Sequence, residues 1–216
     1  QVHTVRKKLR KIREKRDLHR ERREQLGFSS ISLAGYTNAG KSSLFNALTE
    51  ETVRVDTALF TTLSTTTRLV ELSKRKFLLT DTVGFIDRLP LTLIEAFHST
   101  LEETVYSDLI ILVLDVNEPM DLIEKKNNIC LETIDRIGAS GIPMITALNK
   151  IDLLHRTETR QKLEKLREKT KNPILISALR KTNLELVKQE ILKKLENYVQ
   201  ASFLIPLTNQ TMPFMS

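Results

Sequence analysis

The sequence predicts a three-layer α/β domain with a mostly parallel, six-stranded sheet, preceded by a long basic helix. Three observations support this prediction. From residue 28 onward, short apolar segments alternate with segments of helical periodicity, which is typical of folds built on a parallel sheet. Residues 108–115 are almost entirely apolar, as in a strand that is buried on both faces. A glycine-rich phosphate-binding motif also lies between the first expected strand and the first expected helix of the domain.

Residues 1–27 are expected to form a basic helical arm. Residues 4–26 contain neither Gly nor Pro, which favours one continuous helix, and Gly27 is a plausible helix end. Residues 1–26 hold eleven Lys or Arg and four acidic residues, so the arm carries the whole net charge of +7. These charges surround the helix without a broad apolar face, which favours RNA phosphates over a membrane surface as the partner. A solvated linker helix is the alternative.

The expected domain spans residues 28–200, and residues 201–216 form a C-terminal tail to which we assign no structure. The expected strands are 31–34, 68–73, 76–80, 108–115, 142–148 and 173–176. The expected helices are 43–48, 91–105, 121–137, 156–170 and 182–199. Cys130 is the only cysteine and falls on the inner face of its helix. An internal disulfide is therefore excluded, and no apolar run is long enough to cross a membrane, so we expect a cytoplasmic protein.

The segment Gly35–Ser42 fits the pattern G-x-x-x-x-G-K-[ST] of nucleoside-triphosphate-binding proteins. Its glycines let the backbone curl so that N–H groups surround an anion, and the following helix directs its positive end at the phosphates. Lys41 is expected to contact the β- and γ-phosphates, and the Ser42 hydroxyl to bind Mg²⁺. The nucleotide-binding residues expected from this motif are Asn38, Ala39, Gly40, Lys41, Ser42 and Ser43.

A second motif, Asp81-Thr82-Val83-Gly84, follows an expected strand about forty residues later. The Asp81 carboxylate could reach Mg²⁺ through a water molecule, and the N–H of Gly84 could bond the γ-phosphate. Alone, this short pattern is equally compatible with an ordinary turn at a strand end.

Two further motifs predict recognition of a guanine base. In Asn149-Lys150-Ile151-Asp152, the Asp152 carboxylate can accept hydrogen bonds from both N1–H and the exocyclic amine of guanine, a pair that adenine does not offer. Lys150 would lie along the base, and Asn149 would join this loop to the phosphate loop. Ser177 and Ala178 follow the last expected strand, where a backbone N–H could bond guanine O6. All four motifs follow expected strands in order, and ligands bind at that edge of an open α/β sheet.

The chain resembles the translation-factor-type GTPases and, within them, the HflX family. The segments that carry the resemblance are 35–46, 59–63, 66–68 and 81–86. The resemblance implies a P-loop GTPase domain that binds GTP or GDP with Mg²⁺. It also implies that Thr62 joins Mg²⁺ and senses the γ-phosphate, with Thr61 as its competitor. It further implies a preceding N-terminal domain near the basic helix and binding to the large ribosomal subunit. Leu179 departs from the commoner Ser-Ala-Lys pattern.

The expected activity is hydrolysis of GTP, with Lys41, Thr62, Gly84 and Asn38 as catalytic residues. Phe85 occupies the place where Ras-like enzymes carry a water-orienting Gln, so slow intrinsic turnover and a buried Phe85 are expected. The Asn38 oxygen could hold a monovalent cation such as K⁺, or could bond its own backbone instead. Two alternative functions stay open: a nucleotide-gated RNA-binding module with negligible hydrolysis, and a GTPase that serves tRNA modification or membrane transport.

Overall fold

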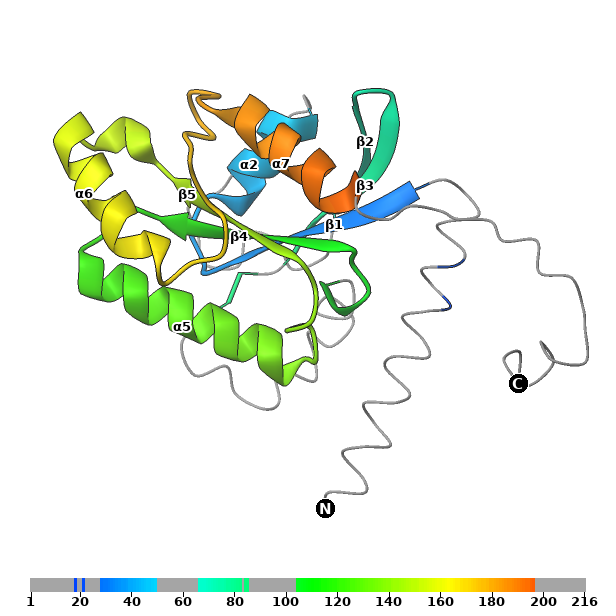
Figure 1. Cartoon of the computed structure of the whole chain (residues 1–216), viewed down its shortest axis with the longest axis horizontal. Helices are drawn as coiled ribbons and strands as arrows, with labels where there is room; N and C mark the ends of the chain where they lie inside the picture. Colours follow the sequence, from blue (N-terminus) through cyan, green and yellow to red (C-terminus); the bar gives the residue numbers. More distant parts are fainter. Residues whose placement is uncertain are drawn as a thin grey trace, which may run out of the picture.

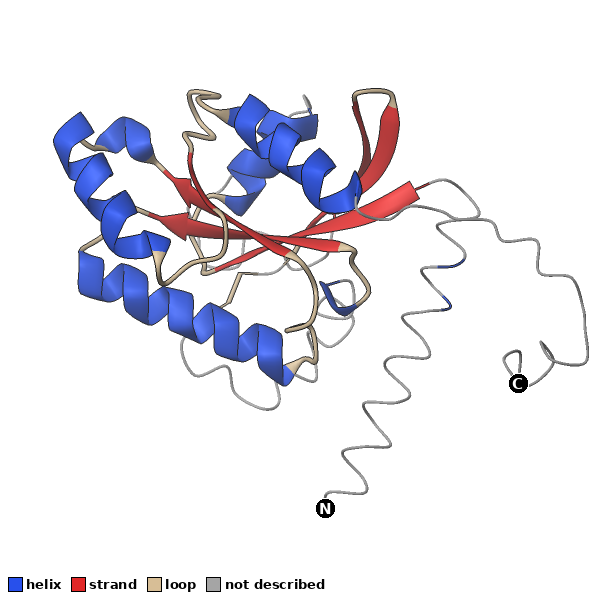
Figure 2. Ribbon diagram, in the orientation of Figure 1, coloured by secondary structure: helices blue, strands red, loops and turns tan. Residues whose placement is uncertain are grey.

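The computed structural model describes residues 28–49, 66–82, 84–85 and 104–196, together with Leu18 and Glu21. In this part of the chain six strands form a sheet in the order β2-β3-β1-β4-β5-β6, with helices on both faces (Figures 1 and 2). The β2–β3 pair is antiparallel and every other pair is parallel. The predicted three-layer α/β fold with a mostly parallel sheet is therefore confirmed.

The observed elements lie where the sequence predicts them, with bounds that differ by a few residues. The strands are β1 (Phe28–Gly35), β2 (Thr66–Leu72), β3 (Arg75–Asp81), β4 (Leu109–Asp115), β5 (Met144–Asn149) and β6 (Pro173–Leu175). The helices are α2 (Lys41–Thr49), α5 (Met120–Arg136), α6 (Arg156–Arg167) and α7 (Leu184–Glu196), with a 3-10 turn η1 (Ile151–Leu153). Most of the predicted helix 91–105, and all but two residues of the basic arm, lie outside the described residues, as does the tail.

The β2–β3 hairpin closes through Ser73 and Lys74, whose φ angles are 49° and 65°. Positive φ at both central residues is the requirement of a type I′ turn, which matches the twist of the flanking strands. Glycine or asparagine usually occupies these positions. Because neither residue is present, the sequence predicts the hairpin without specifying the turn type.

The parallel register brings the strand ends that carry the motifs to one edge of the sheet. Leu33 pairs with Asp81, Gly35 with Val113, and Asp115 with Asn149. The carboxyl ends of β1, β3, β4 and β5 are thus neighbours in space although they are far apart in the sequence. This is the edge at which ligands bind in open α/β sheets.

The central strand β4 separates two apolar cores. Leu109, Ile111 and Val113 belong to the core beneath α2 and α7, which includes Phe45 and Val187. Burial of each such side chain contributes about 1.5–3 kcal/mol, an upper estimate since the unfolded chain already buries part of its surface.

The alternate residues of β4, Ile110, Leu112 and Leu114, belong to the core on the opposite face of the sheet. That core contains Cys130 of α5 and Leu166 of α6. The rigid layer that results fixes the positions of the loops at the carboxyl edge. None of the described helices is long and apolar enough to cross a membrane.

Candidate nucleotide-binding site

The phosphate loop connects β1 to α2 and is held in a tight curve. Asn38 and Gly40 have φ angles of 63° and 94°, and Asn38 is exposed at the outside of the loop. Phe85 supports the loop from the neighbouring segment: its N–H donates to Gly35 O, and its carbonyl accepts the N–H of Thr37, each at 2.9 Å. Phe85 is 1% exposed, so the expected buried anchor of this segment is observed.

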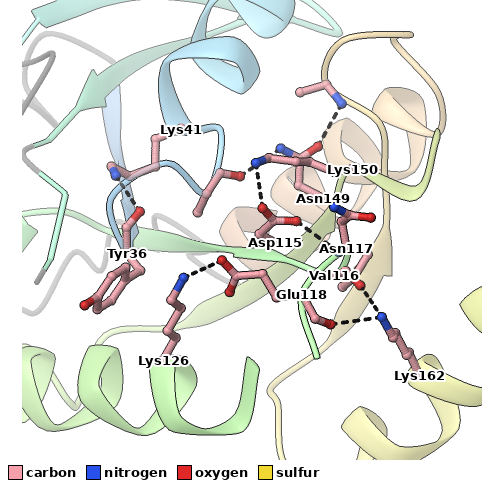
Figure 3. Close-up of polar contacts among 12 residues, drawn as sticks. Tyr36, Lys41, Asp115, Val116, Asn117, Glu118, Lys126, Asn149, Lys150 and Lys162 are labelled. Atoms are coloured by element: carbon pink, nitrogen blue, oxygen red, sulfur yellow. Dashed lines mark hydrogen bonds and ion pairs between the residues drawn. The ribbon is translucent and has the colours of Figure 1, made fainter. Parts of the chain in front are cut away.

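Lys41 is the buried cation of this loop, with only 7% of its surface exposed. Its ammonium donates to Gly35 O at 3.2 Å and to Tyr36 O at 3.1 Å, and Figure 3 shows the contact with Tyr36. An ammonium group has three donors, so one remains for a phosphate oxygen. Burial lowers the pKa of Lys41, and the negative charge of Asp81 opposes that change. A bound phosphate would place negative charge beside the buried ammonium and so compensate the hydration that this cation has lost.

Two of the three residues expected to hold Mg²⁺, Ser42 and Asp81, meet at the start of α2. The Ser42 hydroxyl donates to Asp81 Oδ2 at 2.6 Å, and Asp81 is 2% exposed. Oxygen ligands from a hydroxyl and a carboxylate, completed by phosphate oxygens and water, suit Mg²⁺. The described residues contain no group of three or more His, Cys, Asp or Glu that could hold a metal by themselves. Thr62 and its competitor Thr61 lie outside the described residues.

Two glycines allow the loops of the site to approach one another closely. A Cβ atom at Gly84 would lie 2.9 Å from Lys41 Nζ and 2.8 Å from Thr37 Cγ2. A Cβ atom at Gly40 would lie 2.3 Å from Asn149 Nδ2. The short distance at Gly84 places this glycine beside Lys41, where its N–H is expected to face the γ-phosphate. The short distance at Gly40 places the base motif directly against the phosphate loop.

Asn149 joins the two halves of the site. It ends β5, is 2% exposed, and donates from Nδ2 to Ala39 O at 3.0 Å. Its Oδ1 accepts the N–H of Ala178 at 3.0 Å. One buried side chain therefore links the phosphate loop, the end of β5 and the segment after β6. The hydrogen bond from Asn149 to Ala39 O is the link to the phosphate loop that the sequence predicts.

Asp152 is exposed and already oriented by a neighbour. The hydroxyl of Ser177, which is fully buried, donates to Asp152 Oδ1 and accepts the N–H of Arg180 at 3.0 Å. The other carboxylate oxygen, Oδ2, has no hydrogen-bond partner within the described residues. The sequence analysis expects a backbone N–H of the Ser177–Ala178 segment to bond guanine O6, without specifying which residue supplies it. In this structure the N–H of Ala178 is donated to Asn149 Oδ1 at 3.0 Å.

Lys150 is held by a residue that the sequence analysis does not identify. Its φ is 71°, and its ammonium donates to Asp115 Oδ2 at 2.6 Å (Figure 3). Asp115 ends β4 and is aligned with Asn149 in the next strand. The sequence feature that could have identified Asp115 is its position as a carboxylate at the end of a buried strand, at the edge of the sheet where the other motifs meet.

Cys130 lies on α5 and faces the apolar core, where its side chain is fully buried. Burial raises the pKa of its thiol to about 12, although the nearby charge of Lys41 acts in the opposite direction. A neutral thiol is a weak nucleophile, so the expectation of a structural cysteine agrees with its environment.

Comparison with known proteins identifies relatives of this chain. A family model described as "50S ribosome-binding GTPase" matches residues 30–150. The GTPase HflX of Methanocaldococcus jannaschii is 44% identical over 195 residues, which cover 90% of this chain and 48% of that protein. The GTPase HflX of Saccharolobus solfataricus is 40% identical over 197 residues, which cover 88% of this chain and 55% of the relative. The chain thus spans about half the length of these relatives.

A solved structure resembles the fold as well. The GTP-binding protein of Sulfolobus solfataricus, crystallised in complex with GDP, matches with a TM-score of 0.64 and 35% sequence identity. The match covers 79% of this chain and 53% of that protein.

Proposed function

The chain belongs to the HflX family of GTPases, and from this premise we propose that its domain binds guanine nucleotides, hydrolyses GTP and acts on the large ribosomal subunit. The observation that carries the proposal is the linked arrangement of the four motifs around Asn149. The buried Asn149 amide donates to Ala39 O in the phosphate loop and accepts the N–H of Ala178. Ala178 directly follows Ser177, whose hydroxyl donates to Asp152, the carboxylate suited to guanine. In this arrangement a single ligand with both a guanine base and a phosphate chain can satisfy every motif.

Each end of the site has a defined role in this proposal. Lys41 offers its remaining ammonium N–H to the phosphate chain, together with the main-chain N–H groups of Gly40, Ser42 and Ser43. The N–H of Ala39, which the sequence analysis includes in this set, is donated to Tyr36 O at 3.2 Å in this structure. Asp152 accepts two hydrogen bonds from guanine, each contributing roughly 1.5–3 kcal/mol as a bond to a charged group. Adenine lacks this donor pair, so the carboxylate selects guanine over adenine.

Ser42, Asp81 and Thr62 would hold Mg²⁺, whose charge stabilises the negative charge that develops when the γ-phosphoryl group is transferred to water. Lys41 would contact the β- and γ-phosphates, and the Gly84 N–H would bond the γ-phosphate. GDP and phosphate are the products. Phe85 can neither donate nor accept a hydrogen bond from its side chain, so the attacking water would be oriented by backbone groups, by Thr62 or by the ribosome.

We also propose that Asn38 contributes a ligand for K⁺ beside the phosphates. It is exposed on the rim of the loop, so its side-chain oxygen is accessible. Its positive φ is equally compatible with a purely structural role, since Asn tolerates the left-handed region.

The ribosomal role rests on the family description and on the charge of residues 1–26. Eleven basic residues in so short a segment favour an RNA partner, whose binding then depends steeply on salt. A nucleotide-gated RNA-binding module is the second candidate, because Phe85 replaces the usual water-orienting residue. We place the protein in the cytoplasm, since a single buried cysteine fits a reducing compartment.

The test is GTP turnover by the full chain, measured alone and with isolated large ribosomal subunits. Slow turnover that the subunits accelerate supports the proposal, and deletion of residues 1–26 should flatten the salt dependence of subunit binding. GTP binding without measurable turnover in either condition would instead support the RNA-binding module. Absence of any nucleotide binding would overturn both candidates.

A further inference from the structure

The segment Asp115–Pro119, which comprises the last residue of β4 and the loop that leads to α5, lies between the two halves of the site and contacts both (Figure 3). We propose that this loop positions both nucleotide-binding segments: through Asp115 it holds Lys150 of the base motif, and through Glu118 and Lys126 it holds Tyr36 of the phosphate loop. This inference rests on the proposed function, because it assigns positioning residues to the same nucleotide site. The two connections are called here the base arm and the phosphate arm.

The base arm consists of the Asp115 carboxylate and the Lys150 ammonium. Both oxygens of the carboxylate are used: Oδ2 accepts from Lys150 at 2.6 Å, and Oδ1 accepts the N–H of Asn117 at 2.9 Å. Only 9% of the Asp115 side chain is exposed, so its orientation is fixed by packing as well as by hydrogen bonds. A second link comes from the main chain, where the N–H of Val116 donates to Asn149 O at 3.0 Å.

The phosphate arm begins at Glu118, which forms an ion pair with Lys126 of α5. The Lys126 ammonium also lies 4.7 Å from the centre of the Tyr36 ring, within the range of a cation–π interaction. The carbonyl of Tyr36 in turn accepts the ammonium of Lys41 at 3.1 Å. A continuous series of contacts therefore runs from Glu118 to the cation expected to bind phosphate.

Lys162 of α6 holds the loop by hydrogen bonds to two of its main-chain carbonyls. Its ammonium donates to Val116 O at 2.8 Å and to Glu118 O at 3.0 Å, and it pairs with Glu158 on its own helix. These two carbonyls flank the middle of the loop. The loop is thus anchored to the helical layer independently of either nucleotide-binding segment, as a positioning element must be.

The surroundings of the phosphate arm are closely packed. Tyr36, Asp115, Glu118 and Lys126 border a cavity of about 10 Å³, which has room for a single water molecule and not for a nucleotide. Exposed ion pairs commonly contribute little to the stability of a protein, because solvent screens them and their side chains are mobile. Here the exposed fractions of the Lys126 and Glu118 side chains are 17% and 23%, so their geometry is more restricted.

The two arms predict separable effects on binding. The base arm orients a lysine that lies along the base, so its loss should weaken ligands that contain a base and leave pyrophosphate binding unchanged. The phosphate arm orients the loop that surrounds the phosphates, so its loss should weaken GDP and pyrophosphate by the same factor. A residue that only stabilises the fold would not produce this division.

The experiment measures the affinity of the full chain for GDP directly, and for inorganic pyrophosphate by competition, both with Mg²⁺. Asp115→Asn keeps the acceptor for the Asn117 N–H and removes the charge that holds Lys150. Lys126→Met keeps the aliphatic side chain and removes its charge, whereas Lys126→Arg retains both the cation–π contact and the ion pair. Lys165→Met, on the exposed face of α6, is the matched control. Thermal melting confirms that each variant is folded, and Lys126→Gln replaces Lys126→Met if the latter is not.

We expect Asp115→Asn to weaken GDP binding about tenfold and pyrophosphate binding not at all. Lys126→Met should weaken both by about five- to tenfold, with wild-type affinity recovered in Lys126→Arg and retained in Lys165→Met. Wild-type affinities in both Asp115→Asn and Lys126→Met, or equal losses for both ligands in both variants, would overturn the proposal while leaving the GTPase assignment intact. Failure of the wild-type chain to bind GDP would overturn the proposed function and this proposal with it.

Discussion

The base half and the phosphate half of the site are held in different ways. In the base half, side chains orient one another: Ser177 holds Asp152, and Asp115 holds Lys150. In the phosphate half, Lys41 is bound by main-chain carbonyls of its own loop and is almost completely buried. The base-reading carboxylate is therefore exposed and oriented, whereas the phosphate-binding cation is buried and desolvated.

This difference indicates how each half contributes to binding. An oriented, solvated carboxylate provides selectivity, since its hydrogen bonds distinguish one base from another. A buried ammonium provides affinity for an anion, because a negative ligand compensates the desolvation of the cation. We therefore expect changes in the phosphate half to abolish binding, and changes in the base half to alter which base is bound.

The largest effect is expected from Lys41→Ala. The variant loses the cation that faces the phosphates, so affinity for GDP should fall by about a hundredfold or more. The fold should persist, because the removed group is a desolvated charge rather than part of either apolar core. Titration with a fluorescent GDP analogue measures the affinity, and circular dichroism checks the fold, with Lys181→Ala on the exposed β6–α7 loop as control. A folded variant with normal GDP affinity would show that the phosphates bind elsewhere.

A change of base preference is expected from Asp152→Asn. The amide can donate to the additional carbonyl of xanthine and can no longer accept two bonds from guanine. The ratio of affinities for XDP and GDP should rise by about a hundredfold, since two charge-assisted bonds are affected. Competition binding with both nucleotides measures this ratio. If the variant retains the wild-type preference for GDP, the base contact is not made by Asp152.

Asn149→Ala should affect both halves together. It removes the bonds to Ala39 O and from the Ala178 N–H, leaving two buried main-chain groups without these partners. The free energy of unfolding should fall by about 1–3 kcal/mol for each such group. Urea denaturation measures the loss, and GDP and pyrophosphate affinities should both decrease. A loss confined to GDP would mean that Asn149 acts on the base half alone.

A smaller effect is expected from exchanging monovalent cations. If Asn38 holds K⁺ beside the phosphates, GTP turnover should be several-fold faster in potassium than in sodium salt, and Asn38→Ala should remove the difference. Measurements at equal ionic strength control for general screening. Equal rates in the two salts would assign Asn38 a structural role in the loop.

The smallest effect concerns Cys130, whose buried thiol is close enough to Lys41 for the charge of that residue to influence it. Burial raises the pKa of the thiol to about 12, so the reactive thiolate is scarce at pH 8. A thiol reagent should therefore modify the folded protein very slowly and react promptly after addition of urea. Rapid modification of the native protein would show that this side of the phosphate loop opens to solvent.

Much of the fold is predictable from the sequence because its signals are local. The apolar run 108–115 and the helical spacing of Ile123, Cys130 and Ile134 predict β4 and α5, and the structure confirms both. The phosphate motif and the base motif are likewise short and ordered along the chain. What the sequence does not predict is which side chains from different elements meet.

The contacts that escape prediction are long-range pairs of common residues. Asp115 and Lys150 are 35 positions apart, and nothing in either local pattern marks them as partners. The same is true of Lys126 and Tyr36, which meet only because α5 packs beside the carboxyl end of β1. The N–H of Ala178 is a further example, since it binds Asn149 Oδ1, an acceptor that no local pattern indicates.

The central claim is that this chain is a guanine-nucleotide-binding domain. Isothermal titration calorimetry of the full chain with GDP and with ADP, both in the presence of Mg²⁺, tests it most directly. We predict saturable binding of one GDP per chain and an affinity for ADP at least about a hundredfold lower, because adenine cannot bond to Asp152 in the same way. Equal affinities for the two nucleotides, or no binding of GDP, would contradict the claim.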